Sequence, residues 1–290
     1  MQTEAILLLV LAAFMHAGWN LLSRSSRDKQ AFLWLAEVTV LIVFLLPVVY
    51  LYRPVAVEGW ACVALSGLFE SIYFVLLAKA YELGDLSLVY PVARGSAPLF
   101  VTLFASVALG ERVSLQGVAG ILLVVAGIYT ANIRSSGPRV RSLCTPLLSL
   151  REKPVGLAVL TGMAIASYSV VDKVGIRYAH PLVYTYLVLL VSTLMLAPYV
   201  LLTKRGLIVR EWQAGRLSIV AVAVMTVLAF VLVLTAMSFS KVSYVSAVRE
   251  MSVVVAALLG VLVLREPFGM TRVVGSALIF AGVFCIGLAK

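Results

Sequence analysis

The chain has 290 residues, of which 62% are hydrophobic and 12% are charged, and its formal net charge is +10. A soluble domain usually carries about 25% charged residues, because polar side chains must cover the surface that faces water. This composition, with a mean hydropathy of +1.08, excludes an ordinary soluble protein and indicates that lipid is the main solvent.

Long apolar runs recur along the sequence with short connectors between them, and the alternating pattern of barrel strands is absent. Roughly 20 apolar residues cross a bilayer as a helix, which satisfies its own backbone hydrogen bonds. We predict an all-α polytopic membrane protein with about ten transmembrane helices. They lie near residues 4–22, 31–51, 59–80, 86–109, 114–133, 155–174, 181–202, 214–238, 243–264 and 270–288. The first span is expected to be a transmembrane helix rather than a cleaved signal peptide, because no positive charge precedes it.

The basic residues flank the spans, so they indicate membrane orientation and not binding of nucleic acid. Most of them lie in loops that join an odd-numbered span to the next one. The positive-inside rule then places these loops in the cytoplasm and both termini on the opposite side. The expected location is a plasma membrane, of the bacterial inner-membrane type.

A fixed offset of 155 residues relates the two halves of the chain. It superimposes Arg94 on Arg249, Glu111 on Glu266, Gly120 on Gly275 and Gly127 on Gly282. Each half holds five spans, and an odd number makes the second copy enter the membrane from the opposite face. We therefore predict two inverted five-helix repeats, residues 1–133 and 155–290, joined by a basic linker loop at 134–154.

Several motifs in these halves resemble the EamA domain of the drug/metabolite transporter superfamily. They are PVARGSAP at 91–98, LGER at 109–112 followed by QGVAGILLVVAGI at 116–128, and LREP at 264–267 followed by VVGSALIFAGV at 273–283. The resemblance implies a ten-helix transporter whose central cavity is lined by the first four helices of each half. The second copy departs from the pattern, with Val253 in place of Pro98 and Arg265 in place of Gly110, so the two cavity walls are expected to differ.

Polar side chains inside the spans are candidates for a cavity lining, because a charge at the bilayer centre costs at least about 2.5–3.5 kcal/mol. In the first span, His16, Trp19 and Asn20 are three or four residues apart and share one helix face. In the sixth span, Tyr168 and Asp172 share a face in the same way. Both stripes are expected to face the cavity.

Three more spans carry candidate cavity residues. They are Glu70 and Tyr73 in the third span, Tyr90 and Arg94 in the fourth, and Arg249 and Glu250 in the ninth. Pro91 and Pro98 flank Arg94 and are expected to kink or loosen the helix there. Glu37, in the second span, is a further intramembrane acid to which we assign no cavity role.

The same charges allow a purely structural interpretation. Arg249 with Glu250, or Arg94 with Glu70, could form ion pairs that tie helices together. Glu111 and Glu266 lie at span ends in tight turns, where a capping or interface role is expected.

The predicted function is a secondary transporter that moves a small polar metabolite by alternating access. Arg94 and Arg249 would bind an anionic group, because a guanidinium offers paired planar donors. Glu70, Asp172 or Glu250 would bind an amine or carry a coupling proton, which leaves proton or ion coupling open. An amino-acid-like zwitterion would satisfy both signs.

Two other functions stay open. Multidrug efflux of cations needs a membrane acid with little competing positive charge, which two intramembrane arginines oppose. The other is a non-transporting sensor or assembly factor. An enzyme is disfavoured, because HExxH, GxSxG, P-loop and dinucleotide motifs are absent from the sequence and the three cysteines are isolated. No cofactor or metal is expected; the expected partners are a small-molecule substrate and the lipid bilayer, with a homodimer left open.

Overall fold

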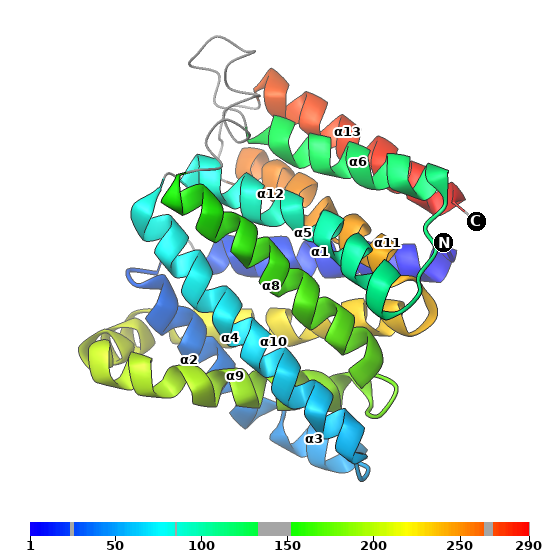
Figure 1. The fold of residues 1–290 in the computed structure, drawn as a ribbon. Coiled ribbons are helices and arrows are strands. Elements are labelled where there is room, and N and C mark those ends of the chain that lie inside the picture. Colours follow the sequence, from blue (N-terminus) through cyan, green and yellow to red (C-terminus); the bar gives the residue numbers. More distant parts are fainter. Residues whose placement is uncertain (24–25, 85, 133–151, 264–268, 290) are drawn as a thin grey trace.

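The computed structural model describes residues 1–23, 26–84, 86–132, 152–263 and 269–289, and within these residues it contains helices and no strand. Figure 1 shows the helices as long, closely packed rods. They are α1 (Thr3–Ser23), α2 (Lys29–Val43), α3 (Leu45–Leu51), α4 (Val57–Leu83), α5 (Leu86–Ala108), α6 (Leu115–Ala131), α8 (Lys153–Gly175), α9 (Pro181–Thr203), α10 (Arg205–Phe239), α11 (Val242–Val248), α12 (Met251–Leu262) and α13 (Met270–Leu288). Most of the predicted linker, together with Arg265 and Glu266, lies outside the described residues.

The helices have the length and composition of membrane spans. In the described part of the chain, eight helical segments are long and apolar enough to cross a membrane, and the bent pair α2–α3 makes a ninth. α6 is apolar but shorter, at 17 residues. Every predicted span overlaps one of these segments or α6, so the all-helical polytopic architecture is confirmed.

The outer surface of the bundle is apolar. Large aliphatic and aromatic side chains such as Leu46, Leu103, Leu202 and Phe284 are more than half exposed there. A soluble protein rarely exposes so many large apolar side chains, whereas lipid tails are a suitable environment for them.

Two spans are interrupted where local chemistry weakens the helix. α2 and α3 meet at a bend of 51°. Pro47, near the start of α3, has no N–H to donate to the carbonyl of Val43, which weakens the helix at this bend. α10 contains a non-helical residue, Gly215, at φ −145° and ψ 37°. Residues 205–214 are therefore a separate short helix of nearly three turns in front of the predicted eighth span.

The contacts between the two halves come in equivalent pairs. If the five spans of the first half are matched in order with those of the second, swapping each helix for its match turns one observed contact into another. α4 packs on α8 and α10 on α1; α5 packs on α8 and α12 on α1; α2 packs on α10 and α9 on α4. Each half thus uses equivalent helices against the other.

α6 and α13 form the closest contact between the halves, and glycines make it possible. A Cβ atom added to Gly120 would lie 2.8 Å from the carbonyl oxygen of Gly282, and one added to Gly127 would lie 2.7 Å from that of Gly275. The residue numbers rise along one helix and fall along the other, so the two helices are antiparallel. They lie side by side at the upper edge of the bundle in Figure 1.

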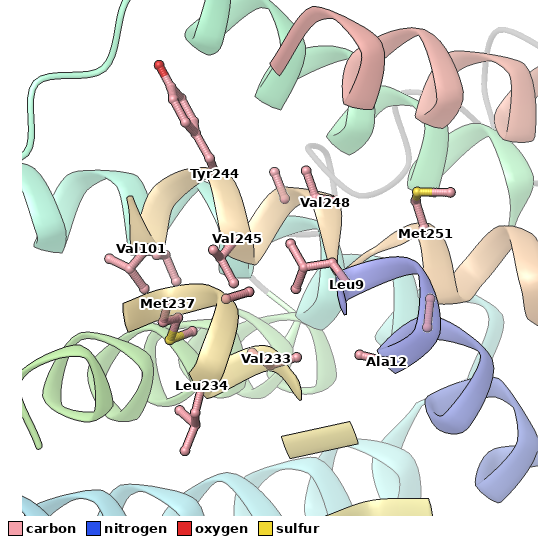
Figure 2. Packing of buried hydrophobic residues seen from close by; sticks show 14 of the residues in the cluster. Leu9, Ala12, Val101, Val233, Leu234, Met237, Tyr244, Val245, Val248 and Met251 are labelled. Carbon is pink, nitrogen blue, oxygen red and sulfur yellow. The ribbon is translucent and has the colours of Figure 1, made fainter. Parts of the chain in front are cut away.

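A large apolar core joins α1, α5, α10, α11 and α12. Figure 2 shows Leu9 of α1 packed near Val245 and Val248 of α11, with Leu234 and Met237 of α10 on the other side. These side chains are almost fully buried. The core therefore fixes the short helix α11 within the bundle.

The two ends of the chain lie on the same face of the bundle. The ammonium group of Met1 donates hydrogen bonds of 3.1 Å to the carbonyl oxygens of Gly287 and Ala289. Figure 1 shows the start of α1 next to the end of α13.

Candidate functional site

A cavity of about 100 Å³ lies between the two halves. Its walls come from α1, α2, α4, α5, α8, α9 and α10, with Arg249 between α11 and α12. Eight of the eleven predicted site residues line it: His16, Trp19, Glu70, Tyr73, Arg94, Tyr168, Asp172 and Arg249. The other three, Asn20, Tyr90 and Glu250, are not part of its lining.

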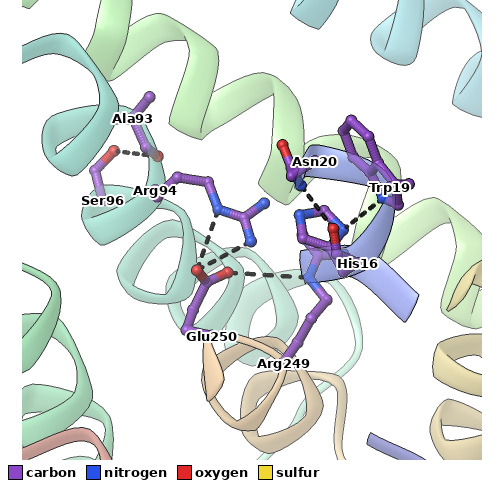
Figure 3. Close-up of polar contacts among 8 residues, drawn as sticks. All are labelled: His16, Trp19, Asn20, Ala93, Arg94, Ser96, Arg249 and Glu250. Carbon is purple, nitrogen blue, oxygen red and sulfur yellow. Dashed lines mark hydrogen bonds and ion pairs between the residues drawn. The ribbon is translucent and has the colours of Figure 1, made fainter. Parts of the chain in front are cut away.

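The two repeat-equivalent arginines meet one carboxylate (Figure 3). Arg94 donates from Nε to Oε2 of Glu250 at 3.1 Å, and its Nη2 lies 3.1 Å from the same oxygen. Arg249 Nε lies 4.0 Å from Oε1 of Glu250. The side chain of Glu250 is only 1% exposed. Of the two predicted structural pairs, Arg249 with Glu250 is present at 4.0 Å. Arg94, which was predicted to pair with Glu70, instead makes the closer contact with Glu250 of the other half.

The helix interruption near the arginines lies in the second half. α5 is one helix that contains Pro91 and Pro98, near which the sequence predicts a kinked or loosened helix. In the second half, two helices, α11 and α12, are separated at Arg249 and Glu250, where no proline is present. Glu250 thereby lies outside regular helix and reaches Arg94.

His16, Trp19 and Asn20 form a connected group on α1. Trp19 donates from Nε1 to Nδ1 of His16 at 3.3 Å, with the rings edge to face at 4.9 Å. Asn20 donates from Nδ2 to the carbonyl oxygen of His16 at 2.8 Å. The amide of Asn20 is thus used within its own helix, whereas His16 and Trp19 line the cavity.

Asp172 is held by two hydroxyl groups. Ser66 donates to its Oδ1 at 2.5 Å, and Tyr184 donates to the same oxygen at 3.0 Å. The residue is 3% exposed. The adjacent Lys173 binds the carbonyl oxygens of Met237 and Ser240 at the end of α10, so it is not the counter-ion of Asp172.

Two tyrosines form an aromatic wall. Tyr73 of α4 and Tyr168 of α8 are edge to face, with ring centroids 6.3 Å apart. Both line the cavity. They offer ring faces and hydroxyl groups to a small solute.

Glu37 is a cavity residue that the sequence prediction missed. It is 7% exposed, lines the cavity and accepts a hydrogen bond of 3.0 Å from Thr193 Oγ1. Its charge inside an apolar span was the available signal. No repeat equivalent supported it, because the 155-residue offset aligns it with Ser192.

Glu111 has the predicted interface role. It accepts hydrogen bonds from the backbone N–H of Val242 at 2.8 Å and the hydroxyl of Ser243 at 2.7 Å. It therefore ties the α5–α6 loop to the start of α11. Among the described residues, no group of three or more His, Cys, Asp or Glu side chains could hold a metal ion.

Comparisons with known proteins agree with this architecture. No curated protein matches the sequence. A solved structure, recorded only as "Crystal structure of protein", has a TM-score of 0.77 and 20% identity, covering 99% of this chain and 98% of the other. At this identity the likeness shows the fold alone.

The family comparison identifies the repeats directly. The model of the EamA-like transporter family matches residues 3–133 and again residues 153–288. These two matches cover nearly the whole chain, one in each half, and they confirm the resemblance seen in the sequence motifs. The chain is a multi-pass membrane protein that belongs to the EamA-like transporter family, whose members are transporters rather than enzymes.

Proposed function

We propose that the protein is a secondary transporter for a small polar metabolite with an anionic group, of the amino-acid or organic-acid kind. The observation that carries this proposal is the cavity between the halves, with the guanidinium of Arg249 on one wall and carboxyl groups on others. Such a site can bind a carboxylate and an amine at once. Transport would proceed by alternating access, in which the halves open the cavity to each side in turn.

The different contacts of the two arginines with Glu250 support an anion-binding site at Arg249. Arg94 is held by Glu250 at 3.1 Å. Arg249 is farther from that carboxylate, and its Nε has no hydrogen-bond partner among the described residues. A substrate carboxylate could satisfy this buried donor, which would otherwise cost free energy.

Ten spans in an inverted repeat are part of the proposal. The antiparallel contact of α6 with α13 supports inversion, because repeat-equivalent helices related by an axis along the membrane normal would be parallel. The termini on one face fit an even number of crossings. We place them outside the cytoplasm of a bacterial-type inner membrane, as the charge bias predicts.

Reconstitution tests the function. Purified protein in liposomes should accumulate at least one radiolabelled solute from a panel of amino acids, organic acids and phosphorylated metabolites. Arg249→Ala should abolish this uptake, and Arg249→Lys should weaken it, because a lysine lacks the paired donors. Arg216→Ala is the matched control, since Arg216 is exposed on α10 and outside the cavity. Absence of uptake for the whole panel would leave a sensor or assembly role as the better explanation.

Efflux of organic cations is the second candidate function. Once Glu250 is paired with Arg94, the cavity retains Glu37, Glu70 and Asp172 against a single arginine. An excess of acids favours a cationic substrate. Arg249→Ala separates the two functions, because anion uptake should collapse while cation efflux should survive.

Topology can be tested by labelling. Single cysteines at positions 205 and 177, in a variant with serine at positions 62, 144 and 285, should react differently with a membrane-impermeant maleimide in intact cells. We expect the cysteine at 177 to be labelled from outside and the cysteine at 205 to be protected. The reverse pattern would invert the proposed orientation.

A further inference from the structure

The carboxyl groups around the cavity outnumber the guanidinium groups. Glu37, Glu70, Asp172 and Glu250 face two arginines, Arg94 and Arg249. All four acids are at least nine-tenths buried. A buried carboxylate without a counter-ion or sufficient hydrogen bonds is unstable as an anion, so the surplus acids need another partner.

Two of the four acids have their partners. Glu250 contacts Arg94 at 3.1 Å and Arg249 at 4.0 Å. Asp172 accepts hydrogen bonds from Ser66 and Tyr184. These contacts stabilise both side chains as anions. Among the described residues, the remaining two acids, Glu37 and Glu70, have no comparable compensation for a buried negative charge.

Glu70 is the least satisfied of the acids. It is 5% exposed and lines the cavity, and its Oε2 has no hydrogen-bond partner in the described part of the chain. Glu37 lines the same cavity and has one hydroxyl partner, Thr193, and no ion pair among the described residues.

The groups that face Glu70 do not compensate its charge. Glu37 on α2 and Asp172 on α8 act on it as like charges, and Arg249 acts as the opposite charge from a distance beyond ion pairing. Tyr168 on α8 and Tyr73 on α4 are neutral neighbours in the cavity wall, Arg94 on α5 is engaged by Glu250, and His16 on α1 lies in the same lining. From α9, Tyr184 binds Asp172.

Building on the transport function proposed above, we propose that Glu70, with Glu37 as its neighbouring acid, is the binding site of the coupling proton. The proton adds to a carboxylate oxygen of Glu70 from water on one side of the membrane. It leaves to water in the cavity when the cavity opens to the other side. No other atom changes its bonding.

The position of Arg249 links this proton to the substrate. Ionised Glu70 attracts Arg249 and competes with an anionic solute for it. Protonation removes that competition, so proton and anion binding favour each other. Because two ligands that favour each other travel together, the coupling is symport.

Infrared spectroscopy tests the proton site without any substrate. The wild-type protein in lipid at neutral pH should show the carbonyl-stretch band of protonated carboxyl groups. Glu70→Gln should remove part of this band, and Glu37→Gln should remove or shift a further part. Glu111→Gln is the control and should leave it unchanged, because Glu111 lies outside the cavity and binds backbone N–H groups. A band that is absent, or that is unaffected by both cavity variants, would overturn the proposal.

Transport measurements separate this proposal from the proposed function. An inward pH gradient should drive accumulation of the transported solute in wild-type liposomes. Glu70→Gln should lose the gradient-driven part but keep exchange of labelled for unlabelled solute. Uptake that ignores the pH gradient, or follows a sodium gradient instead, would refute proton coupling while transport stands. A carboxyl band lost in Glu70→Gln, in a protein that moves no panel solute, would keep the proton site and refute the function.

Discussion

Arg94 and Arg249 occupy equivalent positions in the two halves, yet their surroundings differ. Arg94 is followed by Gly95 on a continuous helix, α5, whereas Arg249 is followed by Glu250 at the break between α11 and α12. Glu250 lies 3.1 Å from Arg94 but 4.0 Å from the arginine beside it. One half therefore supplies the counter-ion for the other. Among the described residues, Nη2 of Arg94 and Nε of Arg249 both lack a hydrogen-bond partner, but only Nη2 of Arg94 lies as close as 3.1 Å to the Glu250 carboxylate.

This difference shows how a repeated sequence builds a one-sided site. The helix pairings between the halves stay equivalent, as the exchanged contacts show. The acidic residues are not repeated in the two halves. At the 155-residue offset, Glu37, Glu70 and Glu250 align with Ser192, Met225 and Gly95. The shared framework supports movement, and the unshared charges create a cavity with two chemically distinct walls.

The largest effect on stability is expected at Glu250. Glu250→Ala should lower the free energy of unfolding by about 3–5 kcal/mol, because it leaves Arg94 buried without a counter-ion. Denaturant titration in detergent measures this cost, with Glu58→Ala, an exposed acid on α4, as the control. The double variant Arg94→Met/Glu250→Leu should recover much of the loss. Equal costs for Glu250→Ala and Glu58→Ala would contradict the pairing.

The α6–α13 contact should respond equally in both halves. Gly127→Ala and Gly282→Ala, which are repeat equivalents, each place a Cβ within 2.7 Å of a carbonyl oxygen on the facing helix. Each should cost about 1–3 kcal/mol, as overpacking does. Gly156→Ala, where a Cβ meets nothing within 4 Å, should be neutral or stabilising. A cost at only one of the two positions would show that this interface is not equivalent for the halves.

Substitutions of the two arginines should affect stability and transport differently. Arg249→Ala should change the unfolding free energy by about 1 kcal/mol or less, because Glu250 keeps its closer partner. Arg94→Ala should cost more, since it removes that partner. Thermal unfolding and liposome uptake measured on the same preparations decide the matter. If Arg249→Ala were the more destabilising variant, Arg249 would be the structural residue.

The smallest effect is expected at the membrane edge, where Asp28 caps α2 and lies 2.6 Å from Lys204. At the 155-residue offset these positions align with Val183 and Val49, so this ion pair has no equivalent in the other half. Burial raises the pKa of Asp28, but hydrogen bonds from Lys204 and Ala31 outweigh it and hold the pKa below its usual value.

The pH dependence of this tie follows from the direction of the shift. The stabilisation is present above the ordinary aspartate pKa and is lost as the pH falls through the lower pKa of the folded protein. Lys204→Met should remove about 1 kcal/mol or less at neutral pH and flatten the acid limb of the stability curve. An unchanged acid limb would show that Lys204 does not perturb Asp28.

The architecture and most of the cavity were predictable from the sequence for physical reasons. Apolar length determines where helices cross, and a fixed offset revealed Arg94 with Arg249 and the packing glycines. Charge in an apolar span identified Glu70 and Asp172 as cavity residues. Asn20 is not among the lining residues, and its amide binds the carbonyl of His16 on the same helix.

The remaining features depend on contacts between distant segments. The partner of Glu250 is Arg94, 156 residues away, and spacing within one helix could not reveal it. Tyr90 lies at the correct helical spacing from Arg94 but does not line the cavity. The helix break at Arg249 and Glu250 has no proline signal, whereas the prolines of α5 lie inside a helix that continues. Packing across the bundle decides these points, and local propensity does not.

The Arg94–Glu250 pair also has a consequence for synthesis. Glu250 is made 156 residues after Arg94, which is roughly 8–30 s at about 5–20 residues per second. During that interval Arg94 has entered the membrane without its final counter-ion. Until the ninth span is inserted, Arg94 must therefore be stabilised by water or by a temporary partner. The order of translation makes insertion of the ninth span the step that supplies the counter-ion of Arg94.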